Sequence, residues 1–101
     1  MNESERVEVL RLCYRWVLIC ANNVDELYAH GLPDAALLFE QYLERWLELA
    51  GVVHRDGLSY DEAVDVVRAT VEGRPVLSAD ASRVVGDVRR EAVEFRPART
   101  A

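Results

Sequence analysis

The best candidate for catalysis in this chain is the segment His54-Arg55-Asp56-Gly57, which holds an imidazole, a guanidinium and a carboxylate within four residues. Imidazole and carboxylate groups can act together in acid–base catalysis. The same segment also has the composition of an ordinary turn, because Asp-Gly pairs are common in turns. A small enzyme built around His54 and Asp56 is therefore our third hypothesis, behind two non-catalytic ones.

Other residues that commonly carry chemistry do not form a recognised pattern. The chain has no glycine-rich phosphate loop, no Gly-x-Ser-x-Gly motif and no Glu-x-x-His pair. Cys13 and Cys20 are seven residues apart, or about 10 Å along a helix, whereas a disulfide needs Cα atoms within about 7 Å. His30 and His54 lie at no zinc-ligand spacing from them. We therefore expect no enzyme activity, no cofactor and no metal, and two buried thiols.

The longest periodic segment, residues 3–29, predicts the first helix. Its central part is apolar on nearly all sides, which is typical of a helix buried on more than one side. A helix of this length extends about 40 Å, whereas a compact 100-residue domain has a radius of gyration of about 13 Å. The helix therefore either projects or breaks, with Asn22-Asn23 as the candidate break. Alternating three- and four-residue steps mark its main seam, which Tyr14, Ala21 and Tyr28 widen: Leu10, Cys13, Val17, Cys20, Val24 and Leu27.

Three shorter amphipathic segments follow, and each predicts a helix. The clearest start is Ser59 with Glu62 three residues later, the spacing of a capping box. Gly51 is expected to end the second helix, and Gly86 to weaken the fourth from inside. Two short pieces, 52–54 and 75–77, are candidates for extended structure. The three predicted helices cover residues 34–50, 59–72 and 80–95.

These segments predict a small all-α domain of four helices. The first two should form a long N-terminal helical hairpin, because few residues connect them. The two shorter helices should pack together across one end of the hairpin. A length of 101 residues suits one domain, which we assign to residues 1–95, with residues 96–101 as a flexible tail.

Composition excludes several classes of protein. No apolar run approaches the roughly 20 residues that a bilayer requires. Glu3 and Glu5 stand where a secretory signal peptide would be basic, so we expect a cytoplasmic protein. All twelve basic residues are arginine, which is typical of a GC-rich bacterial or phage genome.

Three large apolar residues of the first segment, Leu12, Trp16 and Ile19, lie off its main seam. Trp46 and Leu47 similarly widen the apolar side of the second helix. Uncovered apolar patches usually mark interfaces, and tryptophan is enriched among interface anchors. We therefore predict self-association, as a homodimer, through the first helix. The alternative is that the last two helices cover these residues.

Charge suggests a second contact. Residues 1–72 hold fourteen acidic residues against six arginines, a charge of -8, whereas residues 73–101 carry +2. Glu40, Glu44 and Glu48 form a self-repelling row on the second helix, which a basic surface would relieve, on a partner protein or on the chain's own last helix. The other interpretation is a solvated face. The leading hypothesis is a non-enzymatic, acidic protein–protein interaction module of the inhibitor, antitoxin or regulatory-adaptor type.

The second hypothesis is a DNA-binding regulator. Residues 47–67 have the order of elements of a helix-turn-helix: the end of one helix, a short loop and a second helix. Several arginines are available to contact phosphates: Arg68, Arg83, Arg89, Arg90 and Arg96. The proposed second helix opposes this interpretation, because it carries Asp61, Glu62, Asp65 and Glu72 against a single arginine. Phosphate neutralisation supplies most non-specific affinity for DNA. Nucleic acid is therefore the less favoured partner.

Overall fold

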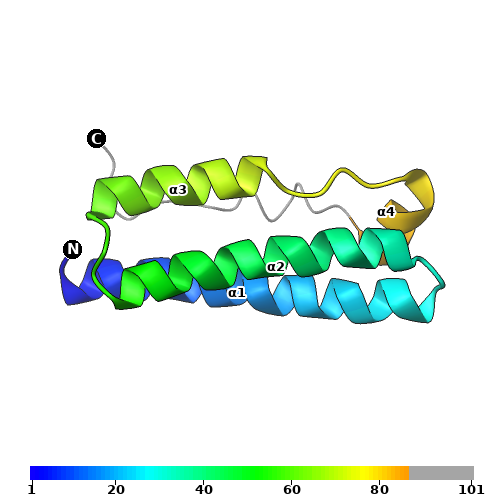
Figure 1. Ribbon diagram of the computed structural model, residues 1–101, viewed down its shortest axis with the longest axis horizontal. Helices are drawn as coiled ribbons and strands as arrows, with labels where there is room; N and C mark the ends of the chain where they lie inside the picture. Colours follow the sequence, from blue (N-terminus) through cyan, green and yellow to red (C-terminus); the bar gives the residue numbers. More distant parts are fainter. Residues whose placement is uncertain (87–101) are drawn as a thin grey trace.

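The computed structural model describes residues 1–86 and shows the predicted small all-α domain (Figure 1). No strand occurs within these residues. The predicted end of the fourth helix, at residue 95, and the predicted tail over residues 96–101 lie outside the described part of the chain. The four helices are α1 (Glu3–Ala29), α2 (Pro33–His54), α3 (Tyr60–Glu72) and α4 (Ala79–Val85).

The predicted N-terminal hairpin is confirmed, and a glycine turn closes it. Gly31 has a φ of 70°, a left-handed conformation that glycine adopts without steric cost. The Leu32 N–H donates to the Leu27 carbonyl at 2.8 Å and the Gly31 N–H to the Tyr28 carbonyl at 3.1 Å, which satisfies the free carbonyls at the end of α1. Before this turn, α1 runs without a break through Asn22-Asn23. The first helix therefore extends along the whole hairpin.

The second helix is longer than predicted, because α2 continues past Gly51 to His54. A glycine inside a helix costs only up to about 1 kcal/mol, and the extra turn buries Val53 completely. Residues 52–54 are therefore helical, and the expected extended piece there is wrong. The helix ends at His54, and Asp56, two residues later, lies in the left-handed region at a φ of 58°.

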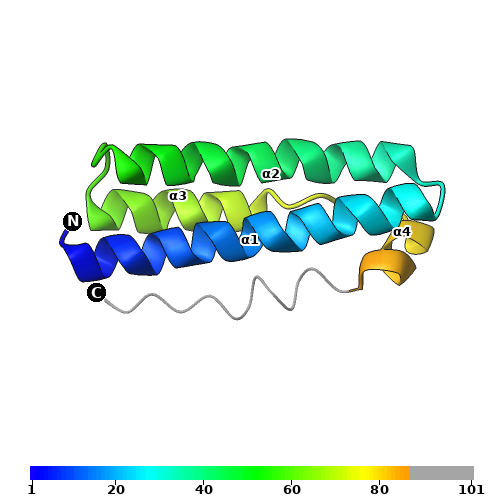
Figure 2. The ribbon, with the colours of Figure 1, turned by 90° about the horizontal axis from the view of Figure 1, so that it is seen from below.

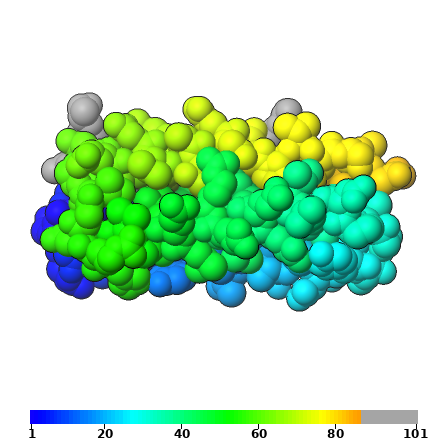
Figure 3. Space-filling model, viewed as in Figure 1, coloured from blue at the N-terminus to red at the C-terminus, as the bar shows by residue number. Residues whose placement is uncertain are grey.

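The two short helices lie at opposite ends of the hairpin rather than together across one end (Figures 1 and 2). A short turn follows α2, so α3 returns antiparallel to it. Pro75 cannot continue a helix, and the chain from Gly73 to Ser78 instead runs along the start of α2 (Figure 3). It thus carries α4 to the end where α1 and α2 join.

Local signals set the ends of both short helices. Ser59 and Glu62 form the predicted capping box at the start of α3. Ser78 caps α4 by accepting a hydrogen bond from the Ala81 N–H. Gly86, predicted inside the fourth helix, lies at the C-terminal end of α4 with a φ of 79°. An Asn2–Glu5 capping box, which the sequence analysis missed, starts α1.

The core is centred on three aromatic rings from α1 and α2. Trp16 stacks on Trp46 with ring centroids 5.5 Å apart and planes 3° from parallel. Tyr42 packs edge-on against both rings, with centroids at 5.8 and 6.1 Å. Its hydroxyl donates to the Thr70 carbonyl of α3 at 2.7 Å. This cluster joins the hairpin to the third helix.

Candidate interaction surface

The structure places Trp16 in the core, where its side chain is 1% exposed. The expectation that Leu12, Trp16 and Ile19 form an uncovered patch is therefore wrong for Trp16. Leu12 and Ile19 are partly buried and pack against the core. The reason for Trp16 is that it packs against Tyr42 and Trp46 of α2, so the side of α1 that meets α2 includes a residue off the main seam.

A different set of apolar residues is exposed on the hairpin. Leu18 on α1 is 66% exposed, and Leu47 on α2 is 44% exposed. Tyr14 and Tyr28 on α1 and Leu37 on α2 are also exposed. The sequence placed Leu47 on a widened apolar side, but Tyr14 and Tyr28 were assigned to the buried seam. The signal that could have found them is their seven-residue spacing on one edge of the helix.

Two hydrogen bonds show that these residues share one side of the hairpin. Tyr14 Oη and His54 Nε2 lie 2.9 Å apart, and the Tyr28 hydroxyl donates to Glu40 Oε1 at 3.0 Å. Residues seven apart lie on the same side of a helix, because seven residues make nearly two turns. The row Tyr14–Ala21–Tyr28 therefore runs beside the row His54–Leu47–Glu40. We call these two rows, with Leu18, Leu37, Glu44 and Gly51 along their edges, the outer hairpin face.

The third helix packs on the other side of the hairpin. Tyr42 of α2 reaches it through the Thr70 carbonyl, and Tyr60 of α3 donates to the Glu8 carboxylate of α1 at 3.2 Å. Figure 2 shows α3 behind the pair formed by α1 and α2. Among the described residues, no other helix covers the outer hairpin face.

The predicted acidic row is divided in the structure. Glu44 and Glu48 are exposed, whereas Glu40 is half-buried and accepts the hydrogen bond from Tyr28. That bond raises the pKa of the Tyr28 hydroxyl, because it stabilises the protonated form beside a carboxylate. Tyr28 thus holds Glu40 in place on the outer hairpin face.

The residues of the catalytic hypothesis are directed toward different partners. His54 bonds Tyr14, whereas Asp56 forms an ion pair with Arg6 Nη2 at 3.1 Å. An acid–base pair needs both groups within reach of one reacting atom. The geometry therefore gives no support to a site built on His54 and Asp56. No cluster of three or more metal-ligating side chains occurs within residues 1–86.

The geometry of residues 47–67 differs from that of a helix-turn-helix. Helices of that motif cross at about 90–120°, whereas α2 and α3 lie antiparallel (Figure 1). Arg68 is exposed on α3 among exposed acidic residues, and Arg83 forms an ion pair with Asp80. Arg89, Arg90 and Arg96 lie outside the described residues.

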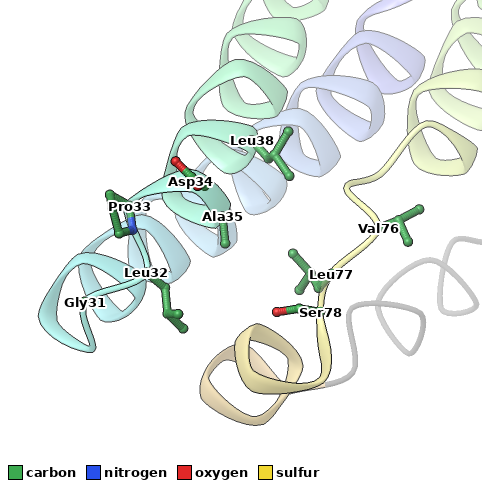
Figure 4. Close-up of a pocket in the computed structure, with 9 residues that line it drawn as sticks. All are labelled: Gly31, Leu32, Pro33, Asp34, Ala35, Leu38, Val76, Leu77 and Ser78. Carbon is green, nitrogen blue, oxygen red and sulfur yellow. The ribbon is translucent and has the colours of Figure 1, made fainter.

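A pocket of about 390 Å³ opens beside the turn between α1 and α2. Figure 4 shows that its walls come from three places: the turn, the first turns of α2, and the segment before α4. Leu32, Leu38 and Leu77 make much of the lining. The Ser78 hydroxyl at its edge already caps α4. The lining is mostly apolar and does not select a particular ligand.

Comparison of the chain with protein-family models, with curated protein sequences and with solved structures gives no significant match. Within the described residues, none of the helices has both the length and the apolar character needed to cross a membrane.

Proposed function

We propose that this protein is a non-enzymatic interaction module that acts through the outer hairpin face. It self-associates through this face and offers its acidic edge, at Glu48, to a partner protein with a basic surface. A cytoplasmic regulator, inhibitor or antitoxin of a bacterium or phage would work in this way. The proposal keeps the homodimer and the basic partner expected from the sequence, but moves the interface from Trp16 to the outer hairpin face.

One observation carries this proposal. The chain buries Trp16 and Trp46 completely in its own core, yet leaves Tyr14, Leu18 and Leu47 exposed on a single face. A small domain with enough apolar residues to build a core gains nothing for its own stability from further large apolar side chains in water. Exposed apolar groups gathered on one face are typical of an interface.

The acidic edge supports the second contact. Glu44 and Glu48 are one helical turn apart and both exposed, so they repel each other by a few tenths of a kcal/mol. A basic partner would remove that repulsion and would be attracted at long range by the net charge of -6.

Sedimentation velocity over a range of concentrations tests self-association. We expect the wild-type protein to sediment as a dimer and Leu18→Arg as a monomer with unchanged helix content. Val66→Arg is a matched control, because Val66 is exposed on α3, away from the outer hairpin face. A wild-type protein that remains monomeric at the highest concentration contradicts the self-association.

A further inference from the structure

We infer that the partner of the outer hairpin face is the same face of a second copy, packed with the two hairpins antiparallel so that Leu47 meets its own counterpart. This inference rests on the proposed function and adds the geometry of the assembly. The twofold axis would run between the two copies, perpendicular to α1 and α2, at the level of Ala21 and Leu47. Each α1 would then pack against the other α1, and each α2 against the other α2, in a four-helix arrangement.

The spacing of the face supports this axis. Tyr14 bonds His54 at one end and Tyr28 bonds Glu40 at the other. Ala21 is midway between the two tyrosines, and Leu47 is midway between His54 and Glu40. The face therefore has two similar ends around one centre. A twofold interface requires a surface that is complementary to itself in this way.

The charges at the two ends are opposite, which selects the antiparallel arrangement. The positive charge at the His54 end is the exposed Arg55, whereas the other end carries Glu40 and Glu44. About the proposed axis, His54 of one copy faces Glu40 of the other. The alternative axis, parallel to the helices, would place His54 ends together and Glu40 ends together, and like charges facing each other are destabilising.

Gly51 provides room for an ion pair between Arg55 of one copy and Glu44 of the other. The Arg55 guanidinium lies over it, since a Cβ at Gly51 would be 3.2 Å from Arg55 Nη1. About the proposed axis, Glu44 of the second copy faces this position. The acidic row that is unrelieved within one copy would thus meet a cation in the dimer, while Glu48 stays at the edge.

The available area predicts a weak pair. The two rows of the face span fourteen residues of each helix, or about 21 Å, so a face two helices wide at about 10 Å per helix offers on the order of 400 Å² per copy. Standard protein–protein interfaces bury about 800 Å² per partner and transient ones bury less, so we expect a dimer that forms at high concentration. At the axis, helices packed 8–10 Å apart bring facing Cα atoms within about 6 Å, which is disulfide distance.

Disulfide trapping tests the arrangement. Leu47→Cys, oxidised with diamide, should form a disulfide-linked dimer, whereas Leu38→Cys should not. Leu38 is a matched control, because it is the same residue on the same helix, 43% exposed against 44% for Leu47, but nine residues away and hence on the opposite side of α2. Native Cys13 and Cys20 are fully buried and should not compete.

A second variant keeps the test decisive if Leu47→Cys weakens the dimer. Ala21→Cys lies on the same axis and should also crosslink to itself. Crosslinking only in a mixture of Ala21→Cys with Leu47→Cys would overturn the antiparallel arrangement, because it places α1 against α2. Absence of any crosslink from a protein that sediments as a dimer would overturn this interface while leaving self-association intact. A monomeric wild-type protein would contradict the proposed self-association itself.

Discussion

Trp16 and Trp46 lie face to face, with ring planes 3° from parallel and centroids 5.5 Å apart. The pair joins the two helices of the hairpin at its centre, and both side chains are inaccessible to solvent. Burial of large aromatic side chains dominates the stability of small cores. The role of Trp16 is therefore to hold the hairpin together rather than to bind a partner.

Substitution of Trp16 should thus lower stability. We expect Trp16→Ala to reduce the free energy of unfolding by about 3–5 kcal/mol, as measured by urea denaturation followed by circular dichroism at a concentration low enough for every protein compared to be monomeric. Leu18→Ala, on the same helix but exposed, should change it by less than about 0.5 kcal/mol. Equal effects of the two substitutions would show that Trp16 is not the core residue described above.

The Tyr42 hydroxyl forms a hydrogen bond that links α3 to the hairpin. The Arg74 N–H donates to the Val71 carbonyl, and Tyr42 supplies the donor for the Thr70 carbonyl in the last turn of α3. Tyr42→Phe should therefore cost about 1 kcal/mol. Tyr14→Phe is the control, because it also removes a hydroxyl but from an exposed bond to His54. Thermal unfolding that ranks the two variants in the opposite order would contradict this assignment.

The loss of stability at alkaline pH should test whether the Tyr42 hydroxyl is buried and protonated. Burial raises the pKa of Tyr42 from 10.0 to about 12, so the folded protein disfavours the ionised form. The corresponding stability is present below pH 10 and is lost as the pH rises through 12. In denaturation experiments over this range, wild type should lose more stability than Tyr42→Phe. Parallel curves for the two proteins would argue against a buried, protonated hydroxyl.

Asp56 adopts a left-handed conformation and also pairs with Arg6. Asp56→Ala should cost about 1–2 kcal/mol, because it loses the ion pair and places a Cβ in the left-handed region without a polar side chain to offset the strain. Asp56→Gly should be nearly neutral, because relief of the backbone offsets an exposed ion pair worth less than about 1 kcal/mol. Melting temperatures of the two variants provide the comparison, and a glycine variant less stable than the alanine variant would be inconsistent with it.

The capping box of α3 should respond to substitution and to acid. Ser59→Ala should lower stability by about 1 kcal/mol, whereas Ser82→Ala, at an exposed position inside α4, should not lower it measurably. Hydrogen bonds from the backbone and side chain of Ser59 lower the pKa of Glu62. The stability that this carboxylate adds is therefore present above its unfolded pKa and is lost as the pH falls through its folded value. A Glu62 titration by NMR that shows an ordinary or raised pKa would contradict the box.

The two cysteines should be inert in the folded protein. Burial raises the pKa of both thiols from 9.0 to about 12, and the thiolate is the reactive form. Labelling with a thiol reagent at pH 8 should be slow for the native protein and rapid in denaturant. Rapid labelling of the native state would mean that α1 opens from α2 or α3 far more often than this core allows.

The helical spacing of apolar residues and the glycines near helix ends were enough to predict four helices, because these signals are local. The Ser59–Glu62 box marked the start of α3 for the same reason. The end of α2 was missed because burial of Val53 outweighs the cost of Gly51, and that burial depends on tertiary contacts. The position of α4 was missed for the same reason. The segment from Gly73 to Ser78 carries α4 to the other end of the hairpin, and the course of that segment depends on its contacts with α2.

The candidate site was harder to predict, because exposure depends on which faces the other helices cover. Trp16 and Tyr14 are two residues apart and both aromatic, yet one is buried and the other exposed. The sequence alone assigned them the other way round, since a two-helix seam was used to decide burial on a helix that contacts three others. Pairing of Tyr14 with His54, forty residues away, could be seen only in the structure.

Backbone NMR spectra recorded while the protein is diluted test the central claim most directly. The account predicts concentration-dependent shifts of amide signals around Tyr14, Leu18, Ala21 and Leu47, with signals around Val66 on α3 unchanged. Spectra that do not change with concentration, or changes centred on α3, would contradict an interface on the outer hairpin face.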